Sequence, residues 1–80
     1  MSDLRMLDKE ATGKNIKRLM RKANLTTFDV QQKMGMTSPS TLYLWMRGEY
    51  VPNAENIVVL SQVLNCGVDD ILVLEGEGDE

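Results

Sequence analysis

The feature that most restricts the fold of this chain is the recurrence of turn and helix-cap residues at short intervals along it. Segments with helical periodicity are separated by turns of only two to five residues. No segment alternates apolar and polar residues in the way a half-buried strand does. The chain has 80 residues, a length that favours one small domain. Together these features predict a compact all-α domain of five short helices.

The first helix is predicted to begin at Thr12, a residue type that caps helices, and to end near Ala23. Its apolar residues Ile16, Leu19 and Met20 recur with helical spacing and share one face. The opposite face is basic and consists of Lys14, Lys17, Arg18, Arg21 and Lys22. This helix therefore has a core side and a charged side.

The second helix is predicted to follow Thr26, which has Asp29 three residues later in a pattern that resembles a capping box. Val30 and Met34 are one helical turn apart and are expected to face the core. Gly35 is expected to end the helix in the left-handed conformation that glycine tolerates.

The third helix is predicted to have Ser38 as its N-cap and Pro39 at its first position, where a missing N–H costs nothing. It is expected to run to about Arg47 and to end at Gly48. Its core side consists of Leu42, Trp45 and Met46. The opposite side consists of Ser40, Tyr43, Leu44 and Arg47, again at helical spacing. Trp45 is therefore assigned to the core rather than to a stacking role.

A fourth helix is predicted from the cap Asn53 to about Leu64, and a short fifth helix over residues 68–74. Cys66, between them, is expected to act as a small buried hydrophobe. These elements divide the chain into an N-terminal arm (1–11), a helical domain (12–74) and an acidic tail (75–80). The glycine-rich tail is predicted to be disordered.

Charge is distributed very unevenly along this acidic chain, whose net charge is −3. Residues 1–50 hold all nine basic residues and five acidic ones, a balance of +4. Residues 51–80 hold seven acidic residues and no basic one, a balance of −7. Such a split indicates a basic face that can meet a polyanion, although a solvated basic surface with an acidic tail also fits it.

Several classes of protein are disfavoured by composition. One cysteine and no histidine leave neither a disulfide framework nor a structural zinc site. The longest apolar run is far shorter than the roughly 20 residues of a membrane span, and the charged N-terminus lacks an apolar secretion segment. We expect no metal, no cofactor and no membrane partner, and a cytoplasmic location.

Five segments of the sequence carry a more specific signal. They read "NIKRLMRKANLT", "DVQQKMGMTS", "STLYLWMRG", "VPNAENIVVLSQVLN" and "VDDIL". In this order and spacing they resemble the Cro/C1-type (Xre-like) helix-turn-helix domain of phage and bacterial repressors. The resemblance covers residues 13–72, about three quarters of the chain. It implies a lambda-repressor-like fold and a sequence-specific DNA-binding transcriptional regulator, with double-stranded DNA as its partner.

The chain departs from the family pattern at three places. The family usually has Ala where Gln31 stands, and the stretch from Gly35 to Gly48 is one residue longer than usual. These two changes predict a slightly altered angle or separation between the second and third helices. Many members pair an Arg and a Glu at the positions of Met20 and Met46. Since both are Met here, an apolar contact is expected to replace the buried ion pair.

The resemblance implies that the third helix, over about residues 38–47, enters the major groove as the recognition helix. The residues then expected to read bases are Pro39, Ser40, Tyr43 and Leu44. The residues expected to contact phosphates are Thr27, Lys33, Ser38, Arg47 and Tyr50, with Lys14, Lys17 and Arg18 as weaker candidates. The family often has Gln at Thr27 and a long polar residue at Leu44, so base reading is expected to differ at these two positions.

The sequence leaves one alternative function open. The same fold can act as a protein-interaction module, such as an antitoxin or the partner of an anti-repressor, and the overall acidity and the Tyr43–Leu44 surface fit that alternative. A homodimer on DNA is also compatible with the sequence. Enzymatic activity is not expected, because the carboxylates cluster in the acidic tail with nothing to position them.

Overall fold

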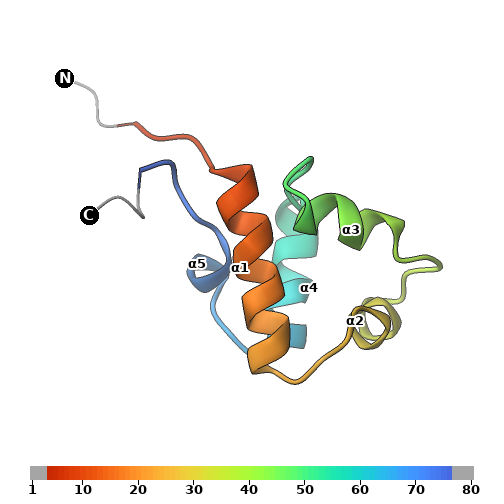
Figure 1. Cartoon of the computed structure of the whole chain (residues 1–80). Coiled ribbons are helices and arrows are strands. Elements are labelled where there is room, and N and C mark those ends of the chain that lie inside the picture. The colour runs from red at the N-terminus through yellow and green to blue at the C-terminus, as the bar shows by residue number, and fades with distance from the viewer. Residues whose placement is uncertain (1–3, 77–80) are drawn as a thin grey trace.

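The all-helical fold is confirmed by the computed structural model of the chain, which describes residues 4–76 (Figure 1). Within that range the five helices are α1 (Lys9–Lys22), α2 (Thr27–Met34), α3 (Ser40–Met46), α4 (Ala54–Leu64) and α5 (Val68–Ile71). Helix α1 packs against α3 and α5, and α4 packs against α2 and α5. No helix in the described part is both long and apolar enough to cross a membrane.

Helix α1 begins four residues earlier than its sequence pattern predicts, and its cap is not Thr12. The N-cap is Asp8, whose Oδ1 accepts a hydrogen bond of 2.9 Å from the backbone N–H of Ala11. Thr12 is instead buried inside the helix. Its Oγ1 accepts from the N–H of Val73 at 3.0 Å and donates to the carbonyl of Val73 at 3.4 Å. The hydroxyl thus joins the C-terminal segment to α1.

The two terminal segments pair with each other instead of extending α5. Helix α5 ends at Ile71, because Leu72 is in the extended conformation. Leu7 and Leu74 form an antiparallel bridge, flanked by hydrogen bonds from Asp8 N–H to the carbonyl of Val73 (2.8 Å) and from Glu75 N–H to that of Met6 (2.9 Å). The prediction of helix as far as Leu74 was therefore wrong.

The division into arm, domain and tail stays a prediction. Of the tail that the sequence predicts to be disordered, residues 77–80 lie outside the described part of the chain.

The ends of α2 and α4 match their predicted caps. Thr26 N–H donates to Asp29 Oδ2 at 2.9 Å, and Asp29 N–H donates to Thr26 Oγ1 at 3.1 Å, which completes the capping box. Gly35 ends α2 with a φ of 72°. Asn53 caps α4, and Asn65 ends it with a φ of 57°.

Helix α3 begins later than predicted. Pro39 is the flanking residue, with a φ of −85° and a ψ of 3°. Since this ψ is not helical, the helix starts at Ser40, and the prediction of Ser38 as N-cap was wrong. The Ser38 Oγ still accepts a hydrogen bond of 3.3 Å from Ser40 N–H. At the other end Arg47 is the C-cap rather than a helical residue.

The core is formed by the predicted apolar faces of the helices. It consists of Ile16, Leu19, Met20, Val30, Leu42, Trp45, Met46, Ile57, Leu60, Leu64 and Ile71. Trp45 is only 3% exposed, which confirms its assignment to the core. Met20 and Met46 are both buried in this cluster, as expected if an apolar pair replaces an ion pair. Cys66 is half-buried and packs against the cluster.

Candidate nucleic-acid interface

The outward side of α3 presents the residues predicted to read bases, to different extents. Ser40 is exposed and Tyr43 is 47% exposed. Pro39 and Leu44 are half-buried. A hydroxyl and a phenol, both hydrogen-bonding groups, are therefore the accessible chemistry of this helix surface.

A groove of about 390 Å³ lies beside α3, between the second half of α1 and the start of α2. Its lining residues are Lys17, Met20, Arg21, Leu25, Thr26, Thr27, Tyr43, Met46 and Arg47. It therefore brings together Thr27, Tyr43 and Arg47, which are predicted to bind DNA, and the weaker candidate Lys17. Its lining includes three cations and no carboxylate, so the groove suits an anion such as a backbone phosphate.

Lys17 and Arg21 both line this groove. The sequence pattern predicts Lys17 only as a weaker phosphate contact and does not predict Arg21 as one. A signal for them existed, because positions 17 and 21 are one helical turn apart and lie on the same side of the core residue Met20 around the helix. What could not be read from the sequence is that this edge of α1 adjoins the start of α2 and the end of α3.

Arg47 takes part in an exposed ion pair. Its Nε lies 2.8 Å from Oε2 of Glu49, and the two side chains are 59% and 51% exposed. Exposed pairs of this kind contribute only about 0–1 kcal/mol, so a phosphate can compete for the guanidinium. The turn that holds Arg47 is fixed by Gly48, which has a φ of 79° and lies so close to Glu10 that a Cβ would be 2.7 Å from its Cα.

The first turn of α2 offers backbone donors next to the groove. The N–H groups of Thr27 and Phe28 have no hydrogen-bond partner among the described residues, whereas that of Asp29 is satisfied by the capping box. Hydrogen bonds from the Thr26 backbone N–H and then from its hydroxyl lower the pKa of Asp29, so its carboxylate stays charged at neutral pH. That negative charge weakens the attraction of this helix end for a phosphate.

Phe28 was missed as a surface residue. It is 64% exposed, next to Thr27 in the first turn of α2. The pattern contained this information, because a position two residues before the buried Val30 lies about 200° around the helix, on nearly the opposite face. An exposed phenyl ring beside the donors of α2 adds an apolar contact point to the surface.

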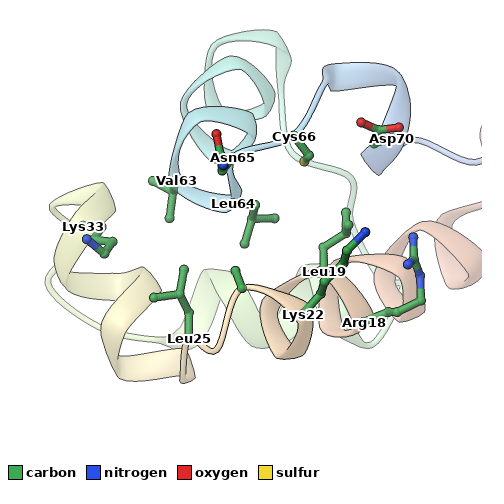
Figure 2. A pocket seen from close by; sticks show the side chains of 11 residues that line it. Arg18, Leu19, Lys22, Leu25, Lys33, Val63, Leu64, Asn65, Cys66 and Asp70 are labelled. Atoms are coloured by element: carbon green, nitrogen blue, oxygen red, sulfur yellow. The ribbon is translucent and has the colours of Figure 1, made fainter.

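The other residues predicted to contact phosphates lie outside this groove. Ser38 is exposed in the turn before α3, and Tyr50 is 61% exposed in the segment after it. Lys33 lines a different groove, with Arg18 and Lys22 (Figure 2). The structure thus gathers only part of the predicted phosphate-binding set in one place.

Gln31 occupies the position where the family usually has Ala. It is half-buried, and its Nε2 donates to the carbonyl of Met36 at 3.4 Å, across the turn between α2 and α3. The Gln31 side chain, longer than that of Ala, therefore stabilises the turn between α2 and α3. The altered separation of α2 and α3 stays a prediction.

Comparison with known structures finds proteins that share this fold. The restriction-modification controller protein C.AhdI from Aeromonas hydrophila superposes with a TM-score of 0.73 at 19% identity, over 80% of this chain and 96% of that one. The clp gene regulator ClgR from C. glutamicum superposes with a TM-score of 0.71 at 21% identity, over 82% of this chain and 84% of that one. At such identities the likeness shows a shared fold. No curated protein sequence matches the chain.

A family model gives the more specific result. The model of the Cro/C1-type helix-turn-helix DNA-binding domain matches residues 15–77. That stretch includes α2, α3 and most of α1, together with α4 and α5. The chain therefore belongs to the Cro/C1-type helix-turn-helix DNA-binding domain family.

Proposed function

We propose that this protein is a sequence-specific DNA-binding transcriptional regulator that inserts α3 into the major groove. Ser40 and Tyr43 donate hydrogen bonds to base edges or phosphates, and Leu44, with Pro39 at the leading end, packs against apolar base edges such as the thymine methyl group. The half-buried state of Leu44 limits it to such a short-range contact.

The cationic groove beside α3 is the observation that carries this proposal. Lys17, Arg21 and Arg47 line it together with Tyr43, in a chain whose net charge is −3. We assign these three cations to contacts with DNA phosphates on either side of the major groove that α3 enters. The N–H groups at the start of α2 add neutral phosphate donors. Lys33, Ser38 and Tyr50 are left as peripheral contacts.

The protein is further proposed to bind as a homodimer. An apolar groove of about 360 Å³ lies between the N-terminal arm, α4 and α5, and no charged residue lines it. Val58 and Val68 on its walls are 49% and 38% exposed. Homodimer interfaces are the most apolar class of protein contacts, and a two-fold dimer matches a two-fold operator. A second copy of the chain is the occupant that suits this surface.

No catalytic role is proposed. Among residues 4–76, no group of His, Cys, Asp and Glu side chains is arranged to hold a metal ion. Within the described residues, a shifted pKa is found for Asp29, in the first turn of α2, and for Cys66, between α4 and α5, and these two positions do not form one site. A DNA-binding regulator acts where its DNA lies, so we place the protein in the cytoplasm.

The test is fluorescence anisotropy with the DNA upstream of the protein's own gene and with a random duplex, at two salt concentrations. Three phosphate contacts give a slope of log affinity against log salt of about −3 per protomer. Tyr43→Ala is expected to cost about 1–3 kcal/mol on the specific duplex and much less on the random one. If neither duplex binds even at low salt, a protein-interaction module of the same fold is the better reading.

A further inference from the structure

The N-terminal arm carries two exposed apolar side chains to which the proposed function gives no role. Leu4 is 93% exposed and Met6 is 73% exposed, the two largest values among the large apolar side chains of residues 4–76. In Figure 1 the arm leaves the body of the domain before α1 and runs beside the C-terminal segment. Neighbouring apolar side chains that are exposed in this way often mark a contact surface.

The direction of the Met6 side chain is set by the pairing of the two terminal segments. The N–H of Glu75 donates to the carbonyl of Met6 at 2.9 Å. The next residue, Leu7, forms the antiparallel bridge with Leu74. Successive side chains of a paired strand point to opposite faces. Because Leu7 lines the apolar groove between the arm, α4 and α5, Met6 points away from the groove of its own copy.

The shape of this groove requires an insert. It has a volume of about 360 Å³, and its lining consists of Leu7, Val51, Pro52, Ala54, Ile57, Val58, Val68 and Leu72. Two such concave surfaces placed face to face would enclose unfilled space, and the lining of a void loses van der Waals contacts. Apolar side chains that project from a segment fill a groove better than a second groove does.

Charge also favours the arm as the occupant. Arg5 lies between the two apolar residues of the arm and is exposed. All but one of the lining residues of the groove come from residues 51–80, a half of the chain with seven acidic residues and no basic one. Glu55 and Asp69 are exposed, and each directly follows a lining residue in the sequence. An apolar segment with one positive charge is therefore complementary to this groove and its surroundings.

We propose that in the homodimer the arm of each copy inserts Leu4 and Met6 into the apolar groove of the other copy. This inference rests on the proposed homodimer and names the segment that fills its interface. In a two-fold dimer both contacts form together, because the same surface is used on both copies. The arm joins the fold at Leu7, so its two apolar side chains lie within three residues of the groove at which the copies meet.

The experiment measures the dimer dissociation constant of the full chain by sedimentation equilibrium, with and without the DNA upstream of its own gene. The arm variant is Leu4→Gln/Met6→Gln, and the groove variant is Val58→Asp. Each should raise the dissociation constant about a hundredfold or more, since two arms lose the burial of their apolar side chains. All three positions are exposed in the single copy, so the variants should melt like wild type by circular dichroism.

Mixing the two variants separates arm exchange from other dimer contacts. In an equimolar mixture, the intact arm of the groove variant meets the intact groove of the arm variant. One of the two contacts is thereby restored, and we expect about tenfold or more of the lost affinity to return. The matched control is the arm variant mixed with Leu4→Gln/Met6→Gln/Val58→Asp. That mixture contains the same substitutions but no intact pair of arm and groove, so it should stay monomeric.

The results that would overturn arm exchange differ from those that would overturn the homodimer itself. If the arm variant dimerises like wild type while the groove variant is monomeric, the arm is not the occupant and the proposed homodimer stands. If the mixture of the two variants is no more dimeric than its control, the arm does not pass between copies. If wild type is monomeric both free and on DNA, arm exchange and the proposed homodimer are both wrong.

Discussion

Gly13 of α1 lies directly against the backbone of Trp45 in α3. A Cβ placed on Gly13 would be 2.4 Å from the Trp45 carbonyl oxygen and 2.7 Å from that of Met46. Both are backbone atoms, so neither can move aside as the end of a flexible side chain could. The absence of a side chain at this one position therefore sets how closely α3 approaches α1, and with it where the outward side of α3 stands.

Gly13→Ala should therefore destabilise the fold even though Ala favours helix. The gain in helix propensity is about 1 kcal/mol, while forcing an extra carbon into a packed contact typically costs 1–3 kcal/mol or more. Because the clash is with backbone atoms, we place its cost at the upper end of that range, about 3 kcal/mol, and expect a net loss of about 2 kcal/mol in the free energy of unfolding, measured by urea denaturation. The neighbouring exposed position supplies a control, since Lys14→Ala should change stability by about 0.5 kcal/mol or less. A Gly13→Ala protein as stable as wild type would contradict the close approach.

The elements that the sequence predicts correctly are those fixed by local chemistry. The capping box of Thr26 and Asp29, the left-handed Gly35 and the cap Asn53 depend on residues within one helical turn of one another. The core faces follow from helical spacing alone, and Trp45 is buried as its position on α3 requires.

The errors arise where distant parts of the chain meet. Thr12 is a residue type that often caps helices, but its hydroxyl is hydrogen-bonded to the backbone of Val73, which is far away in sequence. Asp8 caps the helix instead. Residues near Leu74 have helix-like spacing, yet pairing with Leu7 holds them extended. In the candidate site, the predicted Lys33 lies outside the groove beside α3, whereas the unpredicted Arg21 lines it. Helix packing decides which groove each residue lines, and helix periodicity alone does not reveal it.

Thr12→Val should loosen the C-terminal segment. Val has almost the same shape as Thr but cannot bond to either backbone group of Val73. The Val73 carbonyl keeps the hydrogen bond from the Asp8 N–H, but the half-buried Val73 N–H loses its partner. Leaving a buried donor unpaired costs about 1–3 kcal/mol, and we expect a loss of stability at the lower end of that range. Hydrogen exchange of the Val73 amide should accelerate more than that of amides in α4. Thr12→Ser, which keeps the hydroxyl, should restore slow exchange; if it does not, the hydroxyl is not what holds the segment.

The capping box makes stability depend on pH in the acid range. The pKa of Asp29 is lowered in the folded protein, chiefly by the Thr26 backbone N–H and then by the Thr26 hydroxyl. The stabilisation is therefore complete above the unfolded pKa of about 3.9, and it is lost as pH falls through the lower folded pKa. Wild type should be more stable than Asp29→Asn at neutral pH, and the difference should vanish in strong acid. Urea denaturation at several pH values measures this difference in the free energy of unfolding. Glu75→Gln, at an exposed position, is the control and should change the free energy of unfolding less than Asp29→Asn does.

Lys17 and Arg21 should act on DNA as phosphate contacts. Lys17→Gln and Arg21→Gln are each expected to weaken binding equally on specific and random duplexes, and to reduce the salt slope by about 1. Anisotropy titrations at several salt concentrations provide both quantities. Lys9→Gln removes the same charge from an exposed position that lines none of the three grooves, and should have a much smaller effect. An equal loss in Lys9→Gln would mean that only net charge matters.

The apolar groove between the arm, α4 and α5 should hold the dimer together. Val58, nearly half exposed on its wall, is the position to change, because a carboxylate there would have to be buried against a second copy. Val58→Asp is expected to shift the protein from dimer to monomer in sedimentation equilibrium, and to bring the affinity for a full operator close to that for a half-site. Gln62→Asp is the matched control, since it adds the same charge to an exposed position of α4 outside the groove. If wild type and Val58→Asp have the same mass both free and on the operator, this groove does not carry the dimer contact. If both variants dissociate equally, the growing negative charge of the acidic half separates the copies, and the groove has no specific part in joining them.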